Sequence, residues 1–213
     1  MAGVASHIKV ALFDHDDTLV GTMGPKWKHH KFVAKEYYNK ELTDDEIARH
    51  WGKPFSELIC ALYGTDNAEE ATAYNTACRD DFPKSLFEAT IPTLQKLKNK
   101  GLLVGVVTAT ARFSFEHDSK QHGFPLDLFD YIQTAEDTEF HKPDARVFDP
   151  ALRWLASKHI KPAEVLYVGD GLHDMKASIG AGFNFVGVET GLVTAKGFKD
   201  AGAVSVSSLA MLS

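Results

Sequence analysis

Hydrophobic residues occur along this chain in short, mainly apolar runs, separated by longer segments of mixed polarity. The apolar runs span residues 8–13, 102–107, 165–168 and 185–188, with a shorter one at 204–206. Runs this short and this apolar are typical of strands in a parallel sheet that is covered on both faces. We therefore predict a central parallel sheet built from these five segments.

The segments between these runs have the periodicity of helices. Residues 92–100 close on Gly101, a common C-terminal stop, and residues 145–158 carry apolar side chains at helical spacing. Residues 174–181 form a shorter segment that is rich in small side chains. Strands and helices thus alternate, which predicts an α/β fold with a Rossmann-like, doubly wound parallel sheet as its core.

The stretch between the first two predicted strands breaks this alternation, because it contains no convincing strand. Its segments 26–39, 55–63 and 68–82 are helix-like, and Thr43 precedes three acidic residues as an N-cap would. We predict an all-helical insert placed directly after the first strand. The predicted boundaries are an α/β core domain of residues 1–22 and 90–213, and a helical domain of residues 23–89.

Composition excludes several classes of protein. The net charge of -6 lacks the basic footprint of nucleic-acid binding. Two cysteines are too few for a disulfide framework. The first residues contain no long apolar region of a signal peptide, and no run approaches about 18 apolar residues, so we expect no membrane span and a cytoplasmic location. We expect a monomer or a weak homodimer.

Residues able to carry chemistry gather where the predicted strands end. Because ligands of open α/β sheets collect at the carboxyl ends of the strands, these side chains are expected to converge. Each alone has an ordinary structural explanation, such as capping the next helix, and the functional interpretation depends on the set. The set is Asp14 and Asp16 after the first strand, Thr108 after the second, Asp170 and Asp174 after the third, and Lys142 in the loop before the third strand.

The residue types in this set suit phosphoryl transfer. A carboxylate such as Asp14 can accept a phosphoryl group, and Asp16, two residues on, can donate and take a proton. Two carboxylates such as Asp14 and Asp170 repel each other without a cation, which implies a hard metal with oxygen ligands, and Mg²⁺ fits best. Phosphate oxygens would be bound by Lys142, the Thr108 hydroxyl and the following N–H, that of Ala109.

Four segments in this order resemble the motifs of the haloacid dehalogenase superfamily. They are Asp14-His-Asp-Asp-Thr, Thr108 at the end of an apolar strand, Lys142 within His-Lys-Pro-Asp, and Gly169-Asp-Gly-Leu-His-Asp174. A lone Asp-x-Asp is a weak signal, whereas four ordered motifs are a specific one. The resemblance covers residues 8–212, nearly the whole chain. Within the superfamily, the chain resembles the group that contains phosphoglycolate phosphatases and β-phosphoglucomutases.

The resemblance implies a role for each matching position. Asp14 would be the nucleophile and a metal ligand, and Asp16 the general acid and base with its backbone carbonyl on the metal. Asp170 would be a further ligand, and Asp174 would support the metal or its waters. The helical insert would be a cap of the C1 type. Asp16 favours phosphate chemistry, because the dehalogenases of the superfamily lack an Asp at this position.

The predicted function is a magnesium-dependent phosphatase that hydrolyses a small phosphorylated metabolite through an aspartyl-phosphate. The alternatives are a phosphomutase acting on a sugar phosphate and a non-enzymatic binding protein of the same fold. The sequence leaves the substrate open among phosphoglycolate, sugar phosphates, nucleotides and pyrophosphate. Two further hypotheses are that Lys53, in the helical insert, selects the substrate, and that His15, beside Asp14, contacts the leaving group.

Overall fold

The computed structural model describes residues 5–212 of the chain, which divide into two compact units. The sheet unit comprises the residues up to Gly21 and those from Ser85 onward, and the helical unit comprises residues 22–84. The helical unit ends at residue 84, whereas the sequence predicted its end at residue 89. Ser85 and Leu86 form a short strand, β3, that pairs antiparallel with β2 (Val20–Gly21) and so belongs to the sheet unit. Each unit has its own hydrophobic core.

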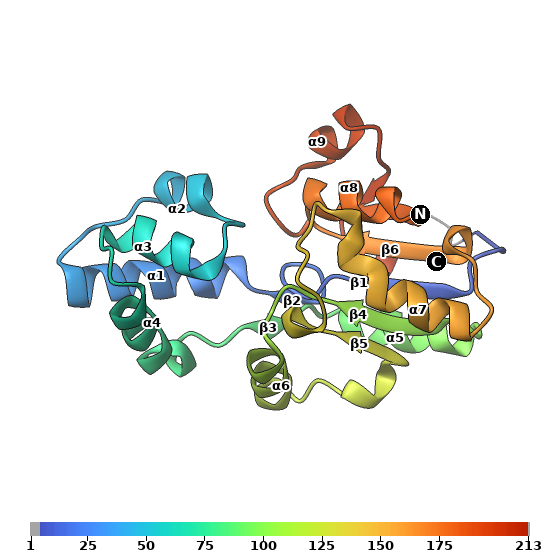
Figure 1. Cartoon of the computed structure of the whole chain (residues 1–213), viewed down its shortest axis with the longest axis horizontal. Helices are drawn as coiled ribbons and strands as arrows, with labels where there is room; N and C mark the ends of the chain where they lie inside the picture. The colour runs from blue at the N-terminus through green and yellow to red at the C-terminus, as the bar shows by residue number, and fades with distance from the viewer. Residues whose placement is uncertain (1–4, 213) are drawn as a thin grey trace. The chain divides into compact units, whose positions relative to one another are not determined.

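A six-stranded parallel sheet forms the centre of the sheet unit (Figure 1). In spatial order its strands are β5 (Tyr131–Gln133), β4 (Leu103–Val107), β1 (Val10–Phe13), β6 (Val165–Gly169), β7 (Asn184–Val188) and β8 (Ser205–Val206). Phe13 of β1 lies beside Val106 of β4 and Val168 of β6, so these three strands end at one edge. The predicted doubly wound parallel sheet is confirmed, and β5 is the strand that the prediction missed.

Helices cover both faces of the sheet. Along β1, Ala11 and Phe13 contribute to one buried cluster, whereas Val10 and Leu12 contribute to another. Because successive side chains of a strand point to opposite faces, this alternation accounts for the uninterrupted apolar runs. The first cluster packs under α5 (Thr90–Asn99) and α6 (Arg112–Gln121), and the second under α7 (Asp149–Ser157) and α8 (Leu172–Gly180).

The helix predicted over residues 145–158 is divided in two. Ala145–Phe148 form a 3₁₀ turn, and α7 begins only at Asp149. Pro150 lies in the first turn of α7, where its missing N–H costs nothing, and it thereby fixes the start of the helix. The remaining elements of the sheet unit are α9 (Ala195–Asp200) and four 3₁₀ turns, η2 (Leu126–Leu128), η3 (Ala135–Asp137), η5 (Pro162–Glu164) and η6 (Leu209–Met211).

The helical unit consists of α1 (Met23–Tyr38), α2 (Asp44–His50), α3 (Phe55–Tyr63), α4 (Ala68–Ala77) and the 3₁₀ turn η1 (Arg79–Asp81). Thr43 caps α2 as predicted: its hydroxyl accepts from the Glu46 N–H and Glu46 bonds back to the Thr43 N–H. The described part of the chain, residues 5–212, has no helix that is both long and apolar enough to cross a membrane.

Two buried histidines lie beside this unit's apolar core. The His30 Nδ1 atom is 2.9 Å from the Tyr63 hydroxyl, which also accepts a 2.8 Å hydrogen bond from Asn75. His29 stacks on Phe82, with ring centroids 5.1 Å apart. Burial lowers the pKa of His29 to about 4 and that of His30 to about 3, so both rings are neutral at pH 7.

Candidate active site

Asp14 is the first residue after β1, and the sheet fixes its backbone. Its N–H donates to the Val168 carbonyl of β6 at 2.8 Å. The chain then folds back sharply, with the N–H groups of Leu19 and Val20 both bonded to the His15 carbonyl. Asp17 takes a left-handed conformation in this turn, with φ of 54°, which Asp tolerates better than most side chains. The turn holds Asp14 and Asp16 at the carboxyl edge of the sheet.

Lys142 binds two of the predicted carboxylates at once. Its ammonium lies 2.6 Å from Asp14 Oδ1 and 2.7 Å from Asp174 Oδ1, and it donates to the Val107 carbonyl at 3.2 Å. These three acceptors match the three N–H donors of the ammonium. The Lys142 side chain is only 5% exposed and that of Asp174 is fully buried. Lys142 therefore fixes the orientation of Asp14 from inside the sheet unit.

Gly169 and Gly191 leave room for the carboxylates of Asp174 and Asp170, which lie against them. A Cβ on Gly169 would lie 2.6 Å from the side-chain carbons of Asp174, so only glycine permits this carboxylate to pack against β6. The Gly171 N–H then donates to Asp174 Oδ2 at 3.0 Å. A Cβ on Gly191, in the loop after β7, would lie 1.8 Å from Asp170 Oδ2. Each glycine is thus required by the close approach of a carboxylate.

The electrostatics of this cluster are dominated by burial and by repulsion between the acids. Burial raises the pKa of Asp14 to about 7, with Lys142 opposing the rise and Asp174 adding to it. Burial and the nearby Asp14 and Asp174 raise the pKa of Asp170 to about 9. Burial opposes the charge on Lys142, but Asp14 and Asp174 outweigh it and raise its pKa well above the ordinary value. One ammonium thus leaves the negative charge of three carboxylates only partly compensated.

The same three acids form a set suited to a hard cation. Carboxylate oxygens of Asp14, Asp170 and Asp174 all lie within 4.8 Å of one another. Small divalent ions of the magnesium class prefer oxygen ligands, and a cation placed among these acids would remove the repulsion that raises the pKa values of Asp14 and Asp170. Donor type, spacing and uncompensated charge therefore fit a divalent cation. Both Asp174 oxygens already accept from Lys142 and Gly171, which leaves Asp14 and Asp170 as the better direct ligands.

Thr108 begins a loop that the neighbouring strand holds in place. The Thr108 N–H donates to the Gln133 carbonyl at 3.0 Å, and the Thr108 hydroxyl accepts from the Thr110 N–H at 3.0 Å. A threonine hydroxyl that accepts one hydrogen bond can still donate its own proton, here to an incoming oxygen. Ala109 lies between these two residues and is exposed. Thr110 was not among the predicted site residues, although its hydroxyl donates to Asp16 Oδ2 at 2.5 Å.

The structure thus brings Asp14, Lys142, Asp170 and Asp174 together, and the loop after Thr108 reaches Asp16. It places His15 elsewhere than hypothesised: the ring is 1% exposed and packs edge-on against Phe115, with centroids 4.9 Å apart, within the core. Lys53 belongs to the helical unit, where its ammonium lies 3.0 Å from His50 Nδ1. Its role in selecting a substrate stays a prediction.

Three residues of the site were missed from the sequence. Thr110 stands two positions after Thr108, and Thr190 and Gly191 directly follow β7, so position after a strand end was the available signal. The Thr190 hydroxyl donates to the Asp17 carbonyl, which ties the loop after β7 to the turn that follows β1. Together with Gly191 against Asp170, this contact makes the loop after β7 a wall of the site.

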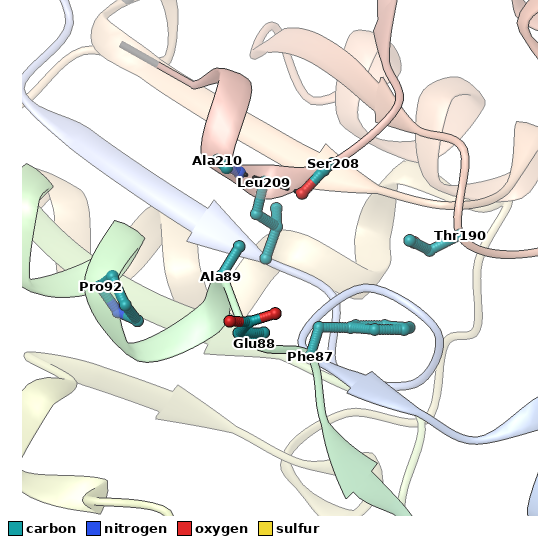
Figure 2. A pocket seen from close by; sticks show the side chains of 8 residues that line it. All are labelled: Phe87, Glu88, Ala89, Pro92, Thr190, Ser208, Leu209 and Ala210. Carbon is teal, nitrogen blue, oxygen red and sulfur yellow. Dashed lines mark hydrogen bonds between the residues drawn. The ribbon is translucent and has the colours of Figure 1, made fainter.

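A hollow of about 480 Å³ has Thr190 in its wall (Figure 2). Its walls come from the segment between β3 and α5, from the first turn of α5, from η6 and the residue before it, and from the loop after β7. They consist of Phe87, Glu88, Ala89, Pro92, Thr190, Ser208, Leu209 and Ala210. None of these is a carboxylate of the cluster, and the wall is largely apolar. The chemistry therefore belongs to the acid and lysine cluster rather than to this hollow.

Comparison with known proteins agrees with this geometry. The family model described as haloacid dehalogenase-like hydrolase matches residues 11–188. The chain is 32% identical to a PpaX protein of Clostridium perfringens, over 85% of this chain and 84% of that protein. It is 29% identical to the pyrophosphatase PpaX of Anoxybacillus flavithermus, over 85% and 84%.

Solved structures give the same family. A haloacid dehalogenase-like protein from Bacteroides fragilis is 32% identical, with a TM-score of 0.78 over 95% of this chain and 98% of that one. The structure of CbbY from Rhodobacter sphaeroides, solved with phosphate, is 21% identical, with a TM-score of 0.77 over 96% of both chains. At that level of identity the likeness to CbbY concerns the fold alone.

Proposed function

The chain belongs to the haloacid dehalogenase-like hydrolases, and we propose that it is a magnesium-dependent phosphatase that hydrolyses a small phosphomonoester through an aspartyl-phosphate. The observation that carries this proposal is the pairing of Asp14 with Lys142 at 2.6 Å inside a cluster of three carboxylates. Such a cluster offers a nucleophile, a fixed positive charge and a cation site within one buried volume. These are the parts that phosphoryl transfer requires.

In this proposal Asp14 attacks phosphorus and Asp16 protonates the departing oxygen. Asp14 is held by Lys142 and by its backbone bond to Val168, so its carboxylate enters the reaction with little freedom to lose. Asp16 then accepts a proton from water, which hydrolyses the aspartyl-phosphate and restores Asp14. Positioned acid and base catalysis of this kind contributes about 100- to 10,000-fold.

The Asp14 and Asp170 side chains would hold the metal, with the Asp16 backbone carbonyl as a third protein ligand. Asp174 would act through Lys142 and Gly171, which its two oxygens engage. Magnesium, when bound, would neutralise charge on the phosphate oxygens and screen the acids from one another. Thr108, the Ala109 N–H and Lys142 would bind the remaining phosphate oxygens, and Lys53 of the helical unit would contact the rest of the substrate.

The substrate class proposed is a small phosphorylated metabolite. Inorganic pyrophosphate belongs in the first test, because the PpaX protein of Anoxybacillus flavithermus carries the name pyrophosphatase. A monomer or a weak homodimer in the cytoplasm stays the expectation for the protein as a whole.

The test measures phosphate release from pyrophosphate, phosphoglycolate, nucleoside monophosphates and sugar phosphates, with magnesium and with EDTA. Asp14→Asn removes the nucleophile at nearly constant shape and is expected to abolish magnesium-dependent release. A folded parent that releases no phosphate from any compound would contradict the phosphatase. Interconversion of sugar-phosphate isomers without net release would instead identify a phosphomutase.

A further inference from the structure

Asp16 is held by a hydrogen bond that the four sequence motifs do not include. The Thr110 hydroxyl donates to Asp16 Oδ2 at 2.5 Å, a distance typical of a strong bond to a charged oxygen. The two residues are 94 positions apart, and both are partly buried. The contact therefore arises from the packing of the sheet unit and not from local chain geometry.

Thr110 is itself fixed on both sides of its backbone. Its N–H donates to the Thr108 hydroxyl at 3.0 Å, and its carbonyl accepts from the Ala135 N–H at 3.1 Å. The Thr108 N–H is in turn bonded to the Gln133 carbonyl, at the end of β5. The Thr110 hydroxyl is thus presented to Asp16 by a loop that is anchored to the next strand of the sheet.

The backbone of Asp16 is constrained as well, since it forms a bridge with Val20 and precedes the left-handed Asp17. What this turn leaves open is the rotation of the carboxylate about its own side-chain bonds. The hydrogen bond from Thr110 to Oδ2 restricts this rotation and favours one orientation of the carboxylate.

We propose that Thr110 is a positioning residue that orients the Asp16 carboxyl group for proton transfer to the leaving oxygen. The inference rests on the proposed function, in which Asp16 is the general acid and base. The proton balance is unchanged by Thr110: Asp16 gives its proton to the leaving oxygen as the phosphorus–oxygen bond breaks, and regains one from the attacking water. Thr110 keeps its own proton throughout.

This role predicts a dependence on the leaving group. Phenyl phosphate and 4-nitrophenyl phosphate share a ring, but the nitrophenolate departs readily without a proton, whereas phenolate benefits from one. Misplacing the acid should therefore slow the first compound more than the second. A general loss of structure would slow both equally.

The variants are Thr110→Val, which keeps the branched shape and removes the donor, and Thr110→Ser, which keeps the donor. We expect Thr110→Val to lower kcat/KM for phenyl phosphate about tenfold and for 4-nitrophenyl phosphate by less than about twofold. Thr110→Ser should stay within about twofold of the parent on both. Thr110→Ala serves as a second removal of the donor if the valine variant unfolds, as judged by thermal melting.

Equal losses on the two compounds, no loss, or a gain in Thr110→Val would each overturn the positioning role. Asp14→Asn separates this outcome from failure of the proposed function. If the parent hydrolyses both compounds and Asp14→Asn does not, the activity belongs to this site and the Thr110 variants decide the inference alone. If Asp14→Asn is as active as the parent, or if the parent releases phosphate neither from these two compounds nor from any member of the panel above, the proposed function fails and the inference falls with it.

Discussion

Replacing Lys142 by methionine should destabilise the sheet unit in a way that depends on pH. Methionine nearly matches the length of lysine but loses the charge and the three donors that contact Asp14, Asp174 and Val107. Removing one partner of a buried ion pair costs about 3–5 kcal/mol, because the remaining charge has neither water nor a partner. We expect the free energy of unfolding of Lys142→Met to fall by about this amount at pH 8.

The loss should shrink on acidification, because the destabilising groups are carboxylates with raised folded-state pKa values. Below the unfolded value of 3.8 such a group is protonated in both states and costs no stability; the cost grows as the pH rises from there to the folded-state pKa, and it is constant above that pKa. In the parent that pKa is about 7 for Asp14, and loss of Lys142 raises it further. At pH 5 Asp14 is therefore protonated in both folded proteins, and its contribution to the loss disappears.

Urea unfolding at pH 5 and pH 8 measures this difference. Lys196→Met is the matched control: its ammonium pairs with Asp200 on the surface, with an 83% exposed side chain, so its loss should stay under about 1 kcal/mol. Magnesium chloride should recover part of the Lys142→Met loss at pH 8, because a bound cation neutralises the same acids. A Lys142→Met loss that is equal at the two pH values would refute the electrostatic reasoning and assign the effect to packing and lost hydrogen bonds.

Two further predictions concern other parts of the chain. Gly191→Ala places a Cβ 1.8 Å from Asp170 Oδ2, so this carboxylate must move. The magnesium concentration for half-maximal activity should therefore rise at least about tenfold. The control is Gly24→Ala, whose Cβ meets nothing within 4 Å and which should match the parent. An unchanged magnesium requirement in Gly191→Ala would remove Asp170 from the ligand set. The helical unit should lose stability as the pH falls below 6.5. Unfolding lets His29 and His30 take up protons at pH values where their folded-state pKa values of about 4 and about 3 keep them neutral. Each histidine should lower the free energy of unfolding by up to about 1.4 kcal/mol per pH unit. Urea unfolding should show a shallower pH slope for His29→Phe, which keeps the ring stack on Phe82, and coinciding slopes would count against the titration of His29.

The sheet was predictable because its central strands are buried on both faces. β1, β4 and β6 each read as uninterrupted apolar runs, and parallel order then places their carboxyl ends together. β5 was missed because it has three residues, of which Tyr131 and Ile132 are only partly buried and the third is Gln133. Within α7, the Asp149-Pro150 pair was present in the sequence as a start signal but lay inside a longer periodic segment that masked it.

The carboxylates and Lys142 were predictable as a set because four motifs occur in one order. What the sequence did not reveal are partners that meet across the fold. Thr110 is an ordinary threonine until folding places it 2.5 Å from Asp16, and Gly191 is an ordinary loop glycine until Asp170 lies against it. The hypothesis for His15 relied on its position next to Asp14 in the sequence. Successive side chains of an extended segment point in opposite directions, so Asp14 faces the site while His15 packs against Phe115.

The place of β1 at the centre of the sheet has a consequence for biosynthesis. β1 leaves the ribosome first, but its neighbours β4 and β6 begin only at Leu103 and Val165. At roughly 5–20 residues per second, the nascent strand therefore waits on the order of ten seconds with both hydrogen-bonding edges open, the condition under which strands pair with wrong partners. The helical unit, whose core closes within residues 22–84, can fold during this interval and lie on the nascent chain directly after the unpaired strand. A chaperone that binds extended apolar segments would thus meet this protein at Val10–Phe13 before Lys142 and Asp174 have been synthesised to pack against Asp14.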